Sequence, residues 1–272
     1  MDNCTIIGAS GFIGSNLHSF LSAKNIKCFC PPRDFNYASE VKLGVVFYCA
    51  GYGDCSNNFL NVVDANLTNI VSLIKNGNFD KLVYVSSTRL YMNSKLSTES
   101  SDLIIGNDDN RKLFNITKLA AEEICRISDK NIVVVRPSNV YGLAINSPLF
   151  LPKIIKNAIN NKHVDMFVDP TYSKDYVSVS DVVELMYKLA FCKNNVEGVY
   201  NIASGYNINA QSIADILIKE TGCTVQWHEN STKEEFPVID MTKTNKIIPH
   251  NYRDMLDDLR DMISKFKSSG GV

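Results

Sequence analysis

The sequence lacks the features that several classes of protein require. Its 28 basic and 29 acidic residues leave a formal net charge of −1, so no positive excess is present to attract nucleic acid or an anionic membrane. No apolar run approaches the roughly 20 residues that a membrane-spanning helix needs. We find no internal repeat, and no low-complexity tract apart from the tail KSSGGV. We therefore expect neither nucleic acid nor a membrane as a partner.

The 8 cysteines form no metal-binding pattern. No two are spaced as CxxC and no histidine-rich segment accompanies them, so the usual zinc spacings are absent. Most cysteines lie inside apolar runs such as KCFC and VFYCAG, where a free thiol behaves as a small hydrophobic side chain. Met1 leads directly into a predicted strand, without a charged-then-apolar leader. These patterns predict a reduced, cytoplasmic protein without a metal ion.

What the sequence does contain is an alternation of short apolar runs with longer helical ones. The apolar runs are β-branched and continuous, which is typical of a parallel sheet covered on both faces. Alternation of the two types predicts an α/β fold with a doubly wound sheet. The predicted strands lie at residues 4–8, 27–30, 44–50, 81–87 and 131–139. The predicted helices between and after them lie at residues 12–24, 59–76, 113–123 and 181–191.

Two features of spacing refine this prediction. Residues 31–44, between the second and third predicted strands, are too few for a full crossover unit, so we expect one βα unit to be reduced. The chain becomes richer in loops in its C-terminal third. We therefore expect a first domain over residues 1–148 with parts of 175–205, and a smaller lobe formed mainly by residues 149–272.

A glycine-rich turn follows the first predicted strand. The run TIIGASGFIG places glycines at 8, 11 and 14, where a strand ends and a helix begins. This is the context of a dinucleotide-binding fingerprint: the first glycine permits the tight turn, the second lets the backbone approach a pyrophosphate, and the third allows close helix packing. The backbone amides that open the helix would face the phosphates. They belong to Ser10, Gly11, Phe12 and Ile13.

The end of the second predicted strand bears on the type of cofactor. An acidic residue there would bind an unphosphorylated adenosine ribose, but KCFCPPRD has two prolines and Arg33. An arginine suits a 2′-phosphate, so the sequence favours NADP(H) over NAD(H). The alternative is that Arg33 is a solvated loop residue and that Asp34 reaches the ribose.

Further motifs follow in one order along most of the chain. They are FYCAG, VYVSSTRLY, FxxxK, RPSNVYG and KDYVSVSDVV. Together with GASGFIG, the set resembles the extended short-chain dehydrogenase/reductases that act as nucleotide-sugar epimerases, dehydratases and reductases. The resemblance implies a Rossmann domain that carries NAD(P), and a C-terminal lobe over a nucleotide diphosphate sugar. Family members often dimerise through the helix that carries Lys118, so a homodimer is an expectation of the family.

The resemblance also implies roles for individual residues. It places the family's catalytic serine or threonine at Ser87 and its Tyr-x-x-x-Lys motif on Phe114 and Lys118. Hydride transfer between a sugar carbon and nicotinamide moves a proton on or off the sugar oxygen, and a tyrosine performs this when a nearby lysine favours its phenolate. The lysine can also bond the nicotinamide ribose. The other residues implied are Ala50, Gly51 and Asn66 at the cofactor, and Arg89, Asn139 and Lys174 at the substrate.

Phe114 lacks the hydroxyl that this chemistry needs. One explanation is a natural change that leaves a binding or regulatory protein, or that moves the acid–base role to Tyr91, Tyr141 or Tyr52. The other is an engineered tyrosine-to-phenylalanine substitution, which we favour because the surrounding motifs are intact. Loss of a positioned general acid costs about 10²–10⁴-fold in rate, so we expect the chain as written to be impaired.

The sequence also bears on the reaction. Family dehydratases carry Asp-Glu directly after the catalytic serine or threonine, and here Thr88 and Arg89 stand in that place. Dehydration is therefore disfavoured. Reduction of a 4-keto sugar is favoured over 4-epimerisation by the compact length and by Arg33. A third hypothesis, a catalytically dead NAD(P)-binding regulatory protein, rests on Phe114.

Overall fold

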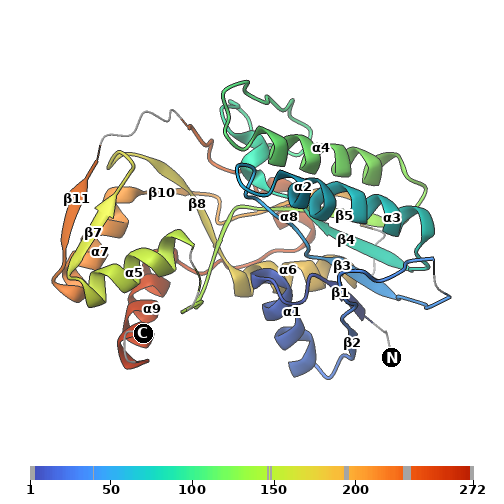
Figure 1. Cartoon of the computed structure of the whole chain (residues 1–272), viewed down its shortest axis with the longest axis horizontal. Helices are drawn as coiled ribbons and strands as arrows, with labels where there is room; N and C mark the ends of the chain where they lie inside the picture. Colours follow the sequence, from blue (N-terminus) through green and yellow to red (C-terminus); the bar gives the residue numbers. More distant parts are fainter. Residues whose placement is uncertain are drawn as a thin grey trace.

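A six-stranded parallel sheet forms the centre of the structure, which is a computed structural model (Figure 1). The strand order is β2-β1-β3-β4-β5-β9. The structure describes residues 4–38, 40–145, 147, 149–192, 196–228 and 234–269. The strands of the sheet are β1 (Cys4–Ile7), β2 (Cys28–Phe29), β3 (Val45–Tyr48), β4 (Lys81–Val85), β5 (Ile132–Pro137) and β9 (Gly198–Ile202).

Helices cover both faces of this sheet, as Figure 1 shows. Because both faces are covered, the central strands β4 and β5 are buried along their whole length, which explains their continuous apolar runs. The predicted doubly wound α/β fold is confirmed. One face carries α1 (Phe12–Ala23) and α6 (Val179–Ala190), and the other carries α2 (Phe59–Val63), η1 (Asp64–Thr68), α3 (Asn69–Asn76) and α4 (Lys112–Ile127).

Two local departures from a regular fold matter for the site. In the described residues between β2 and β3 no helix forms, and β3 pairs directly with β1, so the expected reduction of one βα unit is confirmed. The helix expected over residues 59–76 is interrupted by η1, a π-helical turn. Such turns are frequent at functional sites because they re-aim side chains, and this one contains Asn66.

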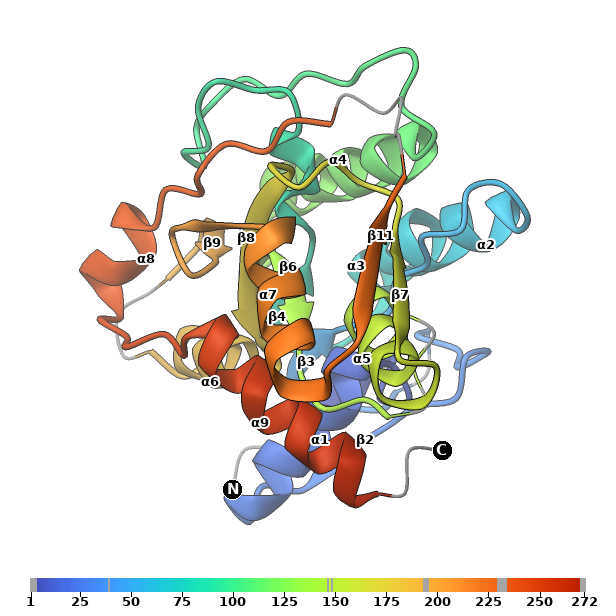
Figure 2. The ribbon, with the colours of Figure 1, turned by 90° about the vertical axis from the view of Figure 1, so that its left-hand side faces the viewer.

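The C-terminal part builds a second apolar core beside the large sheet (Figure 2). It contains one three-stranded sheet in the order β10-β8-β6 and a parallel pair of β11 and β7. Its helix α7 begins at Asn209, whose side chain accepts a hydrogen bond from the backbone of Ser212, and ends at Gly222 with φ 67°. The strands are β6 (Asn139–Tyr141), β7 (His163–Met166), β8 (Ser173–Ser178), β10 (Asn207–Asn209) and β11 (Thr224–Trp227). The helices are α5 (Phe150–Asn160), α7 (Ala210–Thr221) and α9 (Met255–Ser268), while α8 (Thr242–Ile247) packs on β9.

Among the described residues, no disulfide bond joins any of the eight cysteines. Among the described helices, none combines the length and the apolar character needed to cross a membrane.

Candidate active site

The glycine-rich turn joins β1 to α1 at the carboxyl edge of the sheet. Gly8 has φ +83°, a conformation that favours glycine, and a Cβ on Gly14 would lie 2.1 Å from the carbonyl oxygen of Gly8. Packing within the protein therefore requires glycine at these two positions. Gly11 differs, because a Cβ there would have the Gly8 carbonyl oxygen at 3.3 Å as its neighbour. Gly11 leaves room beside the start of α1.

The N-terminus of α1 is open to an anion. No side chain of the described residues caps it, and its first turn contains no acidic residue. The backbone amides of the first turn of a helix have no partner within the helix and carry partial positive charge. An anion could therefore bind at this turn, and a phosphate at the amides of Ser10, Phe12 and Ile13 stays a prediction.

Lys118 lies where α4 meets the ends of two strands. Its Nζ donates a 2.8 Å hydrogen bond to the carbonyl oxygen of Val85, the last residue of β4. The same Nζ would lie 3.4 Å from a Cβ on Gly51, just beyond β3. Burial lowers the pKa of Lys118 to about 8. The ammonium group is thus held at the carboxyl edge of the sheet in a weakly solvated setting.

Of the other two members of the predicted catalytic set, Phe114 lies near this lysine, and Ser87 follows the strand whose last carbonyl the lysine contacts. The centroid of the Phe114 ring is 5.9 Å from Nζ of Lys118. Ser87 follows Val85 by two residues, and its Oγ accepts a 3.1 Å hydrogen bond from the backbone of Arg89, which caps the short helix η2 (Thr88–Tyr91). The Ser87 hydroxyl hydrogen remains available for another acceptor.

The remaining predicted cofactor residues form the loop after β3. Ala50 and Gly51 follow the strand directly, and the backbone of Ala50 lies 2.6 Å from the position of a Cβ on Gly8. Asn66 is fully buried and donates to the carbonyl oxygen of Tyr52 and to Oγ1 of Thr117. Both amide hydrogens of Asn66 are therefore engaged within the protein, and its side chain holds the loop against α4.

Arg33 lies in the turn after β2, at the same edge of the sheet. Its side chain is exposed and forms no hydrogen bond or ion pair with the described part of the chain. It is therefore available to a ligand.

A cavity of about 190 Å³ separates the glycine turn from the C-terminal lobe. Asn139 and Lys174 both line it, as does Phe12 from the glycine turn. Burial lowers the pKa of Lys174. The amide of Asn139 donates a 2.7 Å hydrogen bond to the carbonyl oxygen of Asp175. The structure thus brings the two residues predicted to meet substrate phosphates into one cavity.

Asp175 organises the wall of this cavity and was missed in the sequence. Its buried carboxylate accepts hydrogen bonds from the hydroxyls of Ser138 and Ser204 and from the backbone amides of Gly205 and Tyr206. Because Asp175 lies between Lys174 and Tyr176 on β8, these bonds fix the direction of the lysine. The run KDYV contains the aspartate, but nothing in its spacing indicates these distant partners.

Arg89 takes part in an ion-pair cluster that the sequence did not indicate. Its Nη2 lies 2.8 Å from Oδ1 of Asp109 and 3.0 Å from Oε1 of Glu234. Asp109 stands just before α4, whereas Glu234 comes from the C-terminal part of the chain. The predicted substrate residue Arg89 is therefore neutralised by two carboxylates.

Arg111 lies next to this cluster, and its guanidinium carbon is 4.4 Å from the centroid of the Phe114 ring. In the sequence, the spacing of three residues between Arg111 and Phe114 at the start of a predicted helix could have indicated that the two side chains are neighbours.

Comparison with known proteins identifies the family. The model of the NAD dependent epimerase/dehydratase family matches residues 4–203. The chain belongs to this family. The resemblance inferred from the ordered motifs is thereby confirmed.

Individual members of the epimerase/dehydratase family are distant from this chain. The dTDP-D-glucose 4,6-dehydratase of Dictyostelium discoideum is 23% identical, over 78% of this chain and 61% of its own length. The UDP-glucose 4-epimerase of Mycoplasma genitalium is 23% identical, over 96% of both chains. The solved structure of MoeE5 in complex with UDP-glucose and NAD has a TM-score of 0.84 at 19% identity and covers 99% of each chain. At that identity the structural match shows a shared Rossmann fold.

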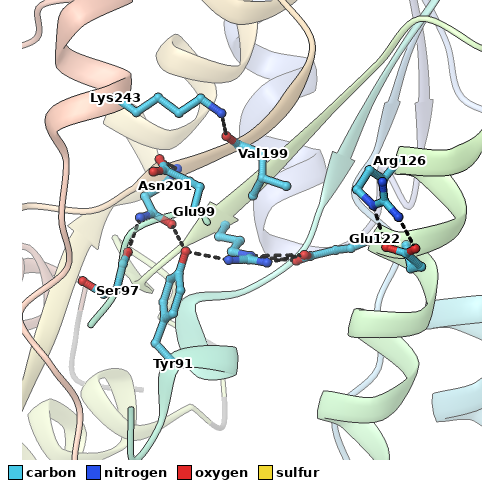
Figure 3. Close-up of polar contacts among 10 residues, drawn as sticks. Tyr91, Ser97, Glu99, Glu122, Arg126, Val199, Asn201 and Lys243 are labelled. Atoms are coloured by element: carbon cyan, nitrogen blue, oxygen red, sulfur yellow. Dashed lines mark hydrogen bonds and ion pairs between the residues drawn. The ribbon is translucent and has the colours of Figure 1, made fainter. Parts of the chain in front are cut away.

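Tyr91 cannot readily supply the hydroxyl that Phe114 lacks. Its side chain is fully buried, and its hydroxyl donates to Asn201 at 2.9 Å and accepts from Nη1 of Arg136 at 2.6 Å (Figure 3). Burial raises the pKa of Tyr91 to about 12, although Arg136 opposes the shift. The hydroxyl is therefore committed to the protein interior.

The other two tyrosines considered from the sequence differ from each other. The hydroxyl of Tyr141 donates a 2.9 Å hydrogen bond to Asp258, and burial raises its pKa, so it too is committed. Tyr52 is half-buried in the loop after β3, and its hydroxyl accepts a 3.3 Å hydrogen bond from Asn58. Of the three, Tyr52 has the hydroxyl with the weakest engagement.

Proposed function

We propose that this protein binds a nicotinamide dinucleotide and a nucleoside diphosphate sugar, and that it transfers hydride at a C4 hydroxyl or ketone of the sugar. The observation that carries the proposal is the position of Lys118. Its ammonium group lies at the carboxyl edge of the sheet, between the ends of β3 and β4 and beside the Phe114 ring. In open α/β sheets, ligands bind at this edge.

The proposal assigns each end of the site to one ligand. The cofactor pyrophosphate lies on the turn at Gly8, Gly11 and Gly14, where α1 presents free amides. The substrate diphosphate lies against Asn139 and Lys174 in the cavity. Ser87 orients the reacting sugar oxygen, and Lys118 bonds the nicotinamide ribose. A nicotinamide cofactor supplies or accepts the hydride in this arrangement.

Among the family reactions, we favour reduction of a 4-keto sugar with NADP(H). Arg33 is exposed and unpaired in the described chain, which suits a 2′-phosphate. The place taken by Asp-Glu in dehydratases holds a buried Thr88 and an Arg89 already bound to two carboxylates. Epimerisation at C4 is the second candidate, because a relative that aligns along nearly its full length is named as a UDP-glucose 4-epimerase.

Direct measurement of bound ligands tests the proposal. Small molecules that copurify with the protein would be identified by mass spectrometry, and dissociation constants for NAD(H), NADP(H) and a panel of nucleoside diphosphates would be measured by calorimetry. Lys174→Ala should weaken the binding of nucleoside diphosphates and reduce the dependence of that binding on salt. Lys95→Ala, at an exposed position, should change neither. Arg33→Ala should weaken the binding of NADP(H) more than the binding of NAD(H). Absence of any shift in melting temperature with millimolar nucleoside diphosphates would contradict the proposed substrate class.

A further inference from the structure

Arg111 is a cation at the reacting end of the site to which the proposed chemistry gives no role. Its guanidinium lies 4.4 Å from the centroid of the Phe114 ring, and its Nη2 would be 2.8 Å from a Cβ on Gly53. Lys118 approaches the same ring at 5.9 Å and the same loop at Gly51. Two cations, one at the N-cap of α4 and one within the helix, therefore meet the Phe114 ring and the loop that follows β3.

Arg111 differs from its neighbour Arg89 in having no counter-ion. It forms no ion pair with any described residue, and its Nε is buried without a hydrogen-bond partner. The two nearby carboxylates are occupied: Asp109 and Glu234 both bind Nη2 of Arg89. Glu234 also accepts a 3.0 Å hydrogen bond from the hydroxyl of Tyr172. A cation held away from water without such a partner is costly.

The charged groups that interact with Lys174 and Arg111 show the same imbalance. Arg89, Arg111 and Lys174 interact with one another, and Asp109 and Glu234 are the carboxylates that oppose them. Burial lowers the pKa of Arg111, and the adjacent Arg89 lowers it further. Burial lowers the pKa of Lys174, and both arginines add to that effect. This group carries one positive charge in excess before Lys118 is counted.

We propose that Arg111 binds a carboxylate carried by the sugar of the substrate, which makes the substrate a nucleoside diphosphate uronic acid. The inference rests on the proposed function, since it assumes that the diphosphate lies against Lys174 and Asn139 and that the sugar lies over Phe114. Arg111 contacts the Phe114 ring, so it meets the sugar end of such a ligand. A guanidinium offers two parallel donors in one plane, which match the two oxygens of a carboxylate.

A purely structural Arg111 predicts a different behaviour. Stacking on Phe114 would stabilise the start of α4, and loss of the guanidinium would then lower the melting temperature and weaken all ligands alike. A carboxylate contact instead discriminates between two sugars that differ at one carbon. The comparison of a neutral and an acidic sugar on the same nucleotide therefore separates the two roles.

The experiment uses the nucleoside diphosphate that the full chain binds best, together with its glucose and glucuronate conjugates. Dissociation constants would be measured by calorimetry for the parent, for Arg111→Gln and for Arg126→Gln. Arg126 is the matched control, because it is an exposed arginine of α4, the helix that Arg111 precedes, and it is paired with Glu123. We expect the parent to prefer the glucuronate conjugate. Arg111→Gln should raise the dissociation constant of the glucuronate conjugate roughly 10- to 100-fold, as for loss of a charge-assisted hydrogen bond. The dissociation constants of the glucose conjugate and of the nucleoside diphosphate alone should stay within about threefold of the parent values.

The possible failures are distinguishable. If the diphosphate binds but the parent does not prefer the glucuronate conjugate, the carboxylate contact is wrong and the proposed function stands. Equal weakening of all three ligands by Arg111→Gln also overturns the inference in favour of a structural role. Arg111→Lys, which keeps the charge and loses the paired donors, should retain part of the preference. If no nucleoside diphosphate binds, the proposed function itself fails, and the inference fails with it.

Discussion

The guanidinium of Arg136 binds both carboxylate oxygens of Glu122, one helical turn along α4 from Lys118. Its Nε lies 2.9 Å from Oε1 and 3.2 Å from Oε2. Arg136 also donates to the hydroxyl of Tyr91, which in turn donates to Asn201 (Figure 3). This buried chain of polar contacts joins α4 to β5 and β9 behind the candidate active site. The Glu122 carboxylate also interacts electrostatically with Lys118, so this buried network supports the part of α4 that carries the lysine.

Glu122→Gln should destabilise the protein strongly, because it leaves the buried charge of Arg136 without a counter-ion. Breaking a buried ion pair by removal of one partner costs about 3–5 kcal/mol. The free energy of unfolding would be measured by urea denaturation. Glu123→Gln is the control on the same helix, where an exposed pair with Arg126 contributes about 0–1 kcal/mol. Equal effects of the two substitutions would contradict the importance assigned to this pair.

Lys118 should make the stability depend on pH in the alkaline range. Burial lowers its pKa from 10.5 to about 8 in the folded protein. Between these two values the unfolded chain binds more protons than the folded one, so the contribution of Lys118 to stability rises as the pH increases. The cost of burying the charged form of Lys118 is present in full below about pH 8. Its loss between about pH 8 and pH 10.5 should raise the free energy of unfolding by roughly 3 kcal/mol.

The measurement compares the parent with Lys118→Met by chemical denaturation from pH 7 to 10.5. The difference in unfolding free energy should be constant near pH 7 and should then shift in favour of the parent. A difference that stays constant across the whole range would show that Lys118 is not held in a weakly solvated site.

Gly11 and Gly14 should respond differently to the same substitution. Gly14→Ala places a Cβ 2.1 Å from the carbonyl oxygen of Gly8, so it should destabilise the fold and lower the melting temperature. Gly11→Ala meets that oxygen at 3.3 Å and should fold, but its methyl group enters the space proposed for the pyrophosphate. We expect weaker binding of NAD(P)(H) by Gly11→Ala and still weaker binding by Gly11→Val. Parent-like affinity in Gly11→Val would place the cofactor elsewhere.

Phe114→Tyr should create or restore activity. Ser87 and Lys118 are already present, and the ring at position 114 lies near the cations of Arg111 and Lys118, which favour the ionised form of a phenol. A recovered general acid–base group should raise turnover by about 10²–10⁴-fold and leave cofactor affinity nearly unchanged. The assay follows nicotinamide absorbance, with analysis of the product sugar to detect epimerisation without net redox change.

The substrates tested for Phe114→Tyr should include nucleotide sugars and their 4-keto forms. Phe59→Tyr, which adds the same hydroxyl at an exposed position of α2, should give no gain. If Phe114→Tyr is inactive with a ligand shown to bind, the reading as a catalytically dead binding protein becomes the better one.

The fold and the location of its glycine turn could be predicted from the order of the residues alone. Alternating apolar and helical runs record which faces are buried, and burial on both faces leaves a continuous apolar signal that needs no knowledge of distant contacts. The reduced βα unit could be predicted because residues 31–44 set a limit on how much structure can form there. Gly8 and Gly14 could be predicted because a tight turn and a close helix contact act locally.

The partners of the buried polar groups, in contrast, depend on how distant parts of the chain pack together. Glu234 neutralises Arg89 across a sequence separation of 145 residues, and Asn201 holds the hydroxyl of Tyr91 across 110. Neither link leaves a periodic or local trace, because each depends on how separate elements pack. The same packing leaves Arg111 without an ion pair among the described residues, while Arg89, on the neighbouring segment, has two. Burial and pairing are properties of the folded chain, so the sequence identified these side chains as polar and the fold determined what each of them can bind.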